Sequence, residues 1–206
     1  MDLYLFDFDK TLYAYDFRFR LPALASASGA SQYQLASRWW AAGYETRAEN
    51  GEWPTAEEYL AEFARVTGST ELTLEQWAHA RSLAMTRNEG TVAALRRASE
   101  LGTVSLLSNN PSVFAEALPL IAPDVCELVG DNRLVSYQLG VRKPNARAYE
   151  LALARYGAEA EDTFFADDSR DNIEGALAVG IHAHHFTTTE LLDEAMDAFI
   201  SRKAAA

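Results

Sequence analysis

Two aspartates stand two residues apart near the start of the chain, directly after an apolar run. The run is Leu3–Phe6, and Asp7 and Asp9 follow it within Asp7-Phe8-Asp9-Lys10-Thr11. Because side chains alternate along an extended chain, residues two apart point to the same side. Two carboxylates on one side of a buried strand end need a cation or a proton to neutralise them. This pair therefore indicates a divalent cation and chemistry that uses it.

Three further polar groups follow later in the chain. They are Ser108-Asn109-Asn110, Lys143-Pro144 and Asp167-Asp168-Ser169-Arg170-Asp171-Asn172. The first and the third each close a short apolar run, whereas Lys143-Pro144 lies in a loop before a predicted helix. Ligands of open parallel sheets bind at the carboxyl edge of the strands. We therefore expect the four groups to meet at that edge and to form one site.

The segments between these groups alternate between strand and helix patterns. Short apolar runs predict strands at Leu3–Phe6, Val104–Leu107, Thr163–Ala166 and Ile181–Phe186. Periodic segments, most of them followed by glycine, predict helices at Gly90–Leu101, Ala146–Tyr156, Arg170–Val179 and Glu190–Arg202. This alternation predicts an α/β fold, with a doubly wound, mainly parallel, Rossmann-like sheet covered by helices on both faces.

One interval is too long for a simple strand–helix–strand unit. Such a unit needs about 30 residues, and the chain between Asp7 and Ser108 is roughly three times as long. Its helical patterns are Ser31–Thr46, Thr55–Thr67 and Thr73–Arg87, and the last two open with capping boxes. We therefore predict a small all-helical cap at residues 15–88, inserted into an α/β core made of residues 1–14 and 89–206.

The composition limits the classes of partner that we expect this protein to bind. The chain has 206 residues and a net charge of −12, which argues against a nucleic-acid backbone or an anionic membrane as main partner. The single cysteine, Cys126, cannot form an internal disulfide. No apolar run is long enough for a transmembrane helix, and the start does not look like a signal peptide. We expect a cytoplasmic enzyme, and either a monomer or a homodimer fits.

In this order, the four groups resemble the motifs of the haloacid dehalogenase-like hydrolase superfamily. The matching residues are Asp7-Phe8-Asp9-Lys10-Thr11-Leu12, Ser108-Asn109, Lys143-Pro144 and Asp167-Asp168 with Asn172. The stretch from Phe164 to Ala176 is especially similar to small sugar-phosphate and nucleotide phosphatases of this superfamily. The resemblance implies Mg²⁺-dependent hydrolysis of a small phosphorylated metabolite, a phosphomonoester, through an aspartyl-phosphate.

The resemblance also implies a role for each of three aspartates. Asp7 would be the nucleophile that attacks phosphorus. Asp9 would protonate the leaving alkoxide and then activate water. Mg²⁺ would be held by the carboxylates of Asp7 and Asp168 and by the backbone carbonyl of Asp9, because hard oxygen ligands suit this ion.

The remaining motif residues would bind phosphate or orient the others. Ser108 and the amide of Asn109 would hold a phosphoryl oxygen, and Lys143 would balance charge as the phosphoryl group transfers. Three more residues would orient the catalytic and metal-binding side chains through contacts with them: Thr11, Asp167 and Asn172.

Two departures from the family pattern bear on function. The dehalogenases of the superfamily lack an acid at the position of Asp9, so its presence favours phosphate chemistry over carbon–halogen cleavage. Lys10 stands where many relatives have glycine, which raises a question about the conformation of the loop. A phosphomutase or phosphotransferase, or a non-catalytic sensor of a phosphorylated ligand, remains an alternative. The sequence does not identify the substrate.

Some other residues have a functional and a plainer interpretation. His182, His184 and His185 could suggest a second metal site, but we expect strand packing and surface positions. Four arginines of the predicted cap could contact an anionic substrate, but we expect them at the surface: Arg18, Arg20, Arg38 and Arg47. Several aromatic residues could line a pocket, but at helical spacing they more often form a core: Trp39, Trp40, Tyr44, Trp53 and Tyr59.

Overall fold

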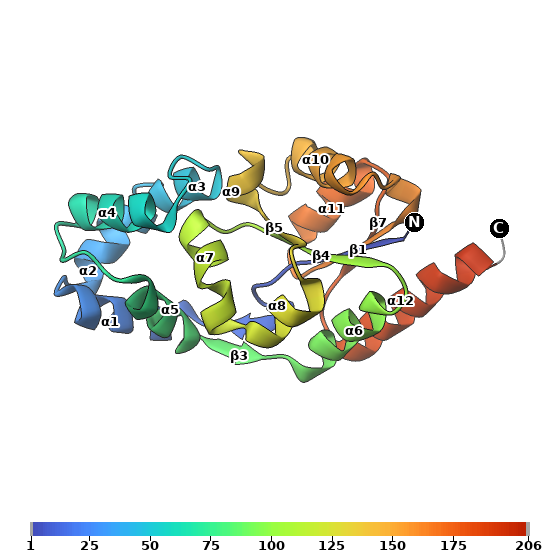
Figure 1. Cartoon of the computed structure of the whole chain (residues 1–206), viewed down its shortest axis with the longest axis horizontal. Helices are drawn as coiled ribbons and strands as arrows, with labels where there is room; N and C mark the ends of the chain where they lie inside the picture. Colours follow the sequence, from blue (N-terminus) through green and yellow to red (C-terminus); the bar gives the residue numbers. More distant parts are fainter. Residues whose placement is uncertain (1, 205–206) are drawn as a thin grey trace.

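A five-stranded parallel sheet forms the centre of the molecule (Figure 1), and the computed structural model describes residues 2–204. The strand order is β5-β4-β1-β6-β7. The strands are β1 Leu3–Phe6, β4 Thr103–Ser108, β5 Arg133–Val135, β6 Thr163–Asp167 and β7 His182–His185. The central strand β1 pairs in parallel with both β4 and β6. The predicted parallel α/β sheet is therefore confirmed.

Both faces of the sheet are covered, as alternation along β1 requires. Leu3 and Leu5 belong to one apolar cluster, whereas Tyr4 and Phe6 belong to the other. The first cluster contains side chains of α10 Ala146–Tyr156 and α11 Arg170–Ala178. The second contains side chains of α6 Glu89–Ser99, α7 Ser112–Ile121, α8 Pro123–Val129 and α12 Thr189–Ala204. The short α9 Ser136–Leu139 follows β5.

Five helices lie between two short strands that pair with each other, and we call this segment the helical insert. The strands are β2 Tyr13–Tyr15 and β3 Met85–Arg87, which run antiparallel. The helices are α1 Phe17–Ser28, α2 Gln32–Leu35 with a π-helical turn at Ala36–Trp40, α3 Tyr44–Glu49, α4 Ala56–Thr67 and α5 Leu74–Ser82. Figure 1 shows these helices grouped at the end of the molecule away from both termini.

The helical insert has an aromatic core of its own. The Trp39 ring lies within 5.6 Å, centroid to centroid, of the rings of Tyr44, Trp53, Tyr59 and Phe63. The two predicted capping boxes are present, at Thr55 with Glu58 and at Thr73 with Gln76. The expectation that these aromatic residues pack together is therefore confirmed.

Several sequence-based expectations need correction. The predicted helix Ser31–Thr46 is broken at a turn that contains Gly43, whose φ is 81°, because the chain reverses there and the left-handed region favours glycine. The predicted helix Thr73–Arg87 ends at Ser82, and its last three residues form β3 because they pair with β2. Arg20 was expected at the surface but is buried, 2% exposed.

The helical insert rests on α7 and α9 of the core. The Ser112 hydroxyl donates to the Trp53 carbonyl at 2.7 Å, and the Ser136 hydroxyl donates to the Glu49 carbonyl at 2.7 Å. The Ala56 amide donates to the Glu116 carboxylate at 2.6 Å. Because Ser112 and Ser136 follow the carboxyl ends of β4 and β5, these contacts place the insert next to the carboxyl edge of the sheet.

Candidate active site

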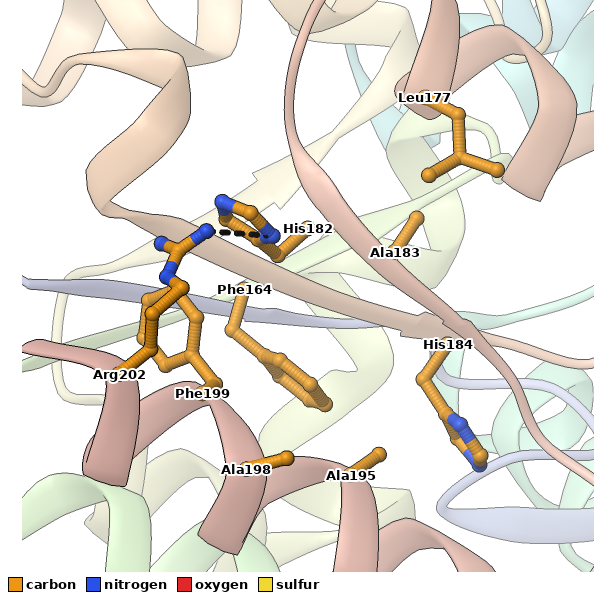
Figure 2. Close-up of a pocket in the computed structure, with 9 residues that line it drawn as sticks. All are labelled: Phe164, Leu177, His182, Ala183, His184, Ala195, Ala198, Phe199 and Arg202. Carbon is orange, nitrogen blue, oxygen red and sulfur yellow. Dashed lines mark hydrogen bonds between the residues drawn. The ribbon is translucent and has the colours of Figure 1, made fainter.

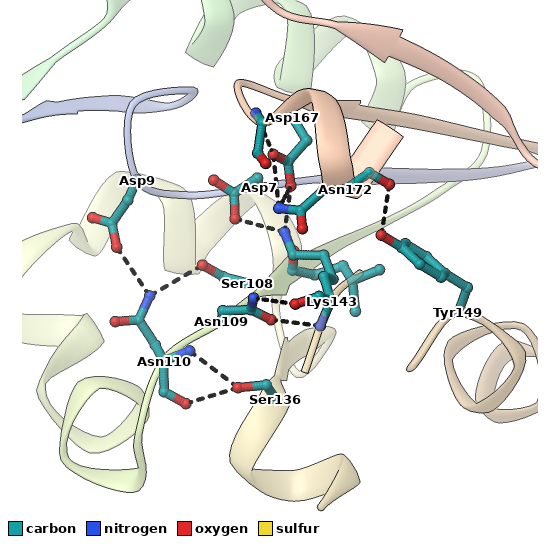
Figure 3. A network of polar contacts seen from close by, with 12 residues as sticks. Asp7, Asp9, Ser108, Asn109, Asn110, Ser136, Lys143, Tyr149, Asp167 and Asn172 are labelled. Atoms are coloured by element: carbon teal, nitrogen blue, oxygen red, sulfur yellow. Dashed lines mark hydrogen bonds and ion pairs between the residues drawn. The ribbon is translucent and has the colours of Figure 1, made fainter. Parts of the chain in front are cut away.

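The four polar groups meet at the carboxyl edge of three neighbouring strands (Figure 3). Asp7 follows β1, Ser108 ends β4 and Asp167 ends β6. Lys143 reaches the same point from the loop that precedes α10. The strand order β4-β1-β6 brings these side chains together, although Asp7 and Lys143 are 136 residues apart in the sequence.

Lys143 is the centre of a buried polar cluster. Its Nζ donates to Asp7 Oδ1 at 2.8 Å, to Asp167 Oδ2 at 2.6 Å and to the Leu107 carbonyl at 2.5 Å. The lysine side chain is 1% exposed. An ammonium group has three donors, so each of its protons has an acceptor and its position is fixed.

Two asparagines hold this cluster from outside. The Asn109 side chain donates to the Lys143 carbonyl and accepts from the Lys143 amide, both at 2.9 Å. The Asn172 amide donates to both oxygens of Asp167, at 3.0 and 2.9 Å. The Asn109 side chain is thus engaged with the lysine loop, which leaves the serine hydroxyl and backbone amides as the groups that could bind phosphate here. Asn172 and Asp167 lie where the sequence analysis expected supporting residues.

Burial and charge act against each other in this cluster. Burial is the main reason that the pKa of Asp7 is raised to about 8, while the Lys143 ammonium opposes this rise and the Asp167 carboxylate contributes to it. Burial by itself lowers the pKa of Lys143, but the carboxylates of Asp7 and Asp167 together raise it above the ordinary value. Asp7 thus needs more positive charge nearby to stay ionised than one lysine supplies.

Three carboxylates could supply the ligands of a cation that brings this charge. Asp7, Asp167 and Asp168 each offer an oxygen, and these oxygens lie within 4.8 Å of one another. Asp167 already accepts from Lys143, Asn172 and the Ser169 amide. Asp168 is less engaged: its side chain is 30% exposed, with the Lys10 ammonium 3.9 Å away. The residues fit a divalent cation bound mainly by Asp7 and Asp168.

Asp9 lies on the other side of the site, toward the helical insert. Its carboxylate accepts from Arg81 Nη2 at 2.5 and 2.6 Å and from the Asn110 amide at 3.1 Å. The same Asn110 amide donates to the Ser108 hydroxyl at 3.1 Å. The contact with Arg81 was not expected, because Arg81 is 72 residues from Asp9 and no sequence spacing connects them.

The loop after Asp9 holds Lys10 in a backbone conformation that is unusual for a residue with a side chain. Lys10 has a φ of 61°, in the left-handed region, where a residue with a β-carbon costs about 1–2 kcal/mol. Glycine adopts this conformation at no such cost, which gives a physical reason for glycine in relatives. Thr11 is fully buried, and its carbonyl accepts from the Thr91 hydroxyl at 2.8 Å. Thr11 therefore ties the loop to the start of α6.

A second hollow lies between β7 and α12, and Figure 2 shows its lining. His182 and His184 both belong to it, and Arg202 contacts His182 at 3.3 Å. None of the residues that line it is acidic. Within residues 2–204 the group of acidic residues that could hold a metal is the one at Asp7, so the histidines are strand residues with no metal assigned.

Solved structures show the same fold. A HAD family enzyme from Bacteroides thetaiotaomicron, solved with magnesium and inorganic phosphate, is 19% identical, with a TM-score of 0.72 over 91% of this chain and 94% of that one. A predicted HAD-like family hydrolase from Porphyromonas gingivalis is 24% identical, with a TM-score of 0.71 over 89% and 90%. The L-2-haloacid dehalogenase from Xanthobacter autotrophicus is 18% identical, with a TM-score of 0.60 over 94% and 81%.

The sequence itself matches a family. The model for haloacid dehalogenase-like hydrolases covers residues 1–180, which includes both acidic pairs, Ser108 and Lys143. This match spans the core strands β1, β4, β5 and β6 together with the helical insert. The chain therefore belongs to the haloacid dehalogenase-like hydrolases.

Proposed function

We propose that this protein is a Mg²⁺-dependent phosphatase that hydrolyses a small phosphomonoester through an aspartyl-phosphate. The observation that carries the proposal is the unequal pair at the end of β1. Asp7 is buried against Lys143, whereas the Asp9 side chain is 25% exposed and faces the helical insert. In this proposal the buried carboxylate attacks phosphorus, and the more exposed one acts on the departing group.

The reaction uses the two aspartates in turn. The Asp7 carboxylate attacks phosphorus, the ester P–O bond breaks, and the leaving oxygen takes the proton of Asp9. Asp9 then takes a proton from water, and this water attacks the aspartyl-phosphate, which releases phosphate and restores Asp7. Lys143 stays at Asp7 throughout and balances the charge of the transferring group.

Three groups complete the site in this proposal. Mg²⁺ would be held by the carboxylates of Asp7 and Asp168 and by the Asp9 carbonyl, and it would supply charge neutralisation for the phosphoryl oxygens. The magnesium-bound relative of the same fold supports this choice of ion. Ser108 and the Asn109 amide hold a phosphoryl oxygen. The helical insert, proposed as a cap at residues 15–88, excludes water and contacts the leaving group.

Asp9 argues against the dehalogenase alternative. When a carbon–halogen bond breaks, the leaving group is a halide ion, which needs no proton. An alkoxide, in contrast, departs from phosphorus far more readily when an acid protonates it. An acid next to the leaving group is therefore useful for phosphate esters. Product analysis with a hexose 1-phosphate separates hydrolysis from transfer to a second hydroxyl, which is what a mutase would do.

The decisive experiment compares the wild type with Asp7→Asn on p-nitrophenyl phosphate with Mg²⁺. The expected result is a loss of at least about 10³-fold in kcat, because the amide is a poor nucleophile, with an unchanged circular dichroism spectrum. Removal of Mg²⁺ with EDTA should reduce the wild-type rate to a similar level, and added Mg²⁺ should restore it. Substantial turnover by Asp7→Asn would reject the aspartyl-phosphate, and an unchanged rate in EDTA would reject the metal.

A further inference from the structure

The helical insert places a buried guanidinium at the proposed acid. Arg81 comes from the last turn of α5, and its side chain is 3% exposed. Its guanidinium carbon lies 4.4 Å from the centre of the Tyr15 ring and 5.2 Å from that of the Phe114 ring. Aromatic contacts of this kind attract a cation and fix the plane of a guanidinium. The orientation of Arg81 is thus set before any ligand arrives.

The donors of Arg81 are only partly used. Nε and Nη2 form one edge of the planar fork, and an oxyanion normally takes one proton from each nitrogen. Here both oxygens of Asp9 accept from Nη2. Nε is buried and, within the described part of the chain, has no hydrogen-bond partner. A buried donor without an acceptor costs about 1–3 kcal/mol, which an incoming acceptor would recover.

Two other polar atoms at the boundary between insert and core lack a hydrogen bond. Arg142 Nε and Glu49 Oε2 are 3.0 Å apart, yet neither makes a hydrogen bond of good geometry among the described residues. Arg142 comes from the loop that carries Lys143, and Glu49 ends α3. Glu49 has Arg142 as its ion-pair partner. Buried polar atoms are normally hydrogen-bonded, so these atoms retain the capacity to bond to a ligand.

We propose that Arg81 determines substrate specificity by binding an anionic substituent of the leaving group, a carboxylate or a second phosphate. This proposal rests on the proposed phosphatase function. The atom that leaves phosphorus must lie beside Asp9, since Asp9 protonates it. Whatever is attached to that atom then extends toward the helical insert and meets the guanidinium that contacts Asp9. The favoured substrate is a phosphomonoester with a second negative charge a few bonds from the ester oxygen.

The test uses two matched pairs of esters with Mg²⁺ and measures kcat/KM for each. The first pair is 2-phosphoglycolate and 2-hydroxyethyl phosphate, and the second is propane-1,3-diol bisphosphate and its monophosphate. The wild type should prefer the ester with the additional anion in at least one pair, and the preferred pair identifies the anion. Arg81→Gln should lower kcat/KM for that ester about 100-fold, mainly through KM, and for its neutral partner less than about 5-fold.

Two further variants keep the result interpretable. Arg81→Lys keeps the charge but not the fork, so it should recover part of the preference if Arg81→Gln folds poorly. Arg65→Gln is the matched control, because Arg65 is an exposed arginine of the insert that pairs with Glu62, and it should change neither pair.

Three outcomes would overturn the proposal. A wild type without preference in either pair would reject the anionic subsite, as would equal losses on both esters in Arg81→Gln, which would mean that Arg81 only positions Asp9. Turnover of p-nitrophenyl phosphate in the same preparation separates these results from a failure of the phosphatase function. If no ester is hydrolysed, including p-nitrophenyl phosphate, both proposals are rejected.

Discussion

The two sides of the site both pair a buried cation with carboxylates, yet they are built differently. On one side, Lys143 uses every proton on acceptors that belong to the core. On the other, Arg81 reaches from the insert to Asp9, and its Nε is left over. The first side is saturated and rigid, whereas the second retains unused polar atoms. This difference fits the proposed function, in which Lys143 meets the same phosphoryl group in every substrate and Arg81 meets a leaving group that varies.

Substitution of Lys143, the cation on the saturated side, should have the largest effect on stability and activity. In Lys143→Met, Asp7 and Asp167 would face each other without a counter-charge, and loss of one partner of a buried pair costs about 3–5 kcal/mol. We expect a drop of about 3 kcal/mol or more in the free energy of unfolding, measured in urea. We also expect at least about a 10³-fold loss of kcat, because in the proposed mechanism Lys143 stabilises the transferring charge.

Lys10→Met is the matched control for this prediction. Lys10 also places an ammonium near a carboxylate of the site, 3.9 Å from Asp168, but its side chain is 63% exposed. Exposed pairs contribute about 0–1 kcal/mol, so this variant should keep its stability and most of its activity. Similar losses in the two variants would contradict the view that burial makes the difference.

Substitution on the unsaturated side should give an effect that depends on the leaving group. Asp9→Asn removes the proton donor of the proposed mechanism, and general acid catalysis contributes about 10²–10⁴-fold. We expect a loss of this size in kcat for glycerol phosphate, whose alkoxide leaves poorly, and about 10-fold for p-nitrophenyl phosphate. Steady-state rates on both substrates measure the ratio. Equal losses would mean that Asp9 is not the acid.

Glu49 offers the smallest effect and a test by pH. Burial is the main reason that the pKa of Glu49 is raised from 4.5 to about 7, while the Glu45 charge contributes to this rise and the Arg142 charge opposes it. Because the ionised form is the disfavoured one, its destabilisation is absent below the unfolded-state pKa and grows as the pH rises through the folded-state pKa. Glu49→Gln should therefore stabilise the protein at pH 8, by up to about 3 kcal/mol at 1.36 kcal/mol per unit, and change little at pH 4.5.

Urea unfolding at these two pH values measures the difference. Glu52→Gln is the control, because Glu52 is an exposed acid of the insert paired with Arg47, and it should show no gain at pH 8. If Glu49→Gln destabilised the protein at pH 8, the Arg142 contact would outweigh the cost of burial. The unsaturated side would then resemble the saturated one.

The sequence predicted the parts of the fold that have strong local signals. β1 is Leu3–Phe6 and α10 is Ala146–Tyr156, as expected from an apolar run and from a periodic segment that ends at a glycine. β5 has three residues, and α7 to α9 were not anticipated, since no such pattern separates them. The pairing of β2 with β3 depends on two segments far apart in the chain, which local propensity cannot detect.

The same division holds for the site. Asp7, Ser108, Lys143 and Asp167 come together because each follows or precedes a core element, and this could be predicted from their positions. Arg81 could not, because its role depends on how α5 packs against the core. The insert arginines that were singled out have other partners: Arg18 pairs with Asp16, Arg38 with the Thr67 carbonyl, and Arg47 with Glu52.

The ladder between β2 and β3 makes the helical insert an exchangeable part. Tyr15 pairs with Met85, so the chain leaves the core and returns to it at neighbouring positions. Asp124 on α8 connects both strands to the core, since it accepts from the Tyr13 hydroxyl at 3.0 Å and from the Arg87 guanidinium at 2.6 Å. Under the proposed function, exchange of the segment between β2 and β3 would change the leaving-group preference, while Asp7, Ser108, Lys143 and Asp167 stay on the core.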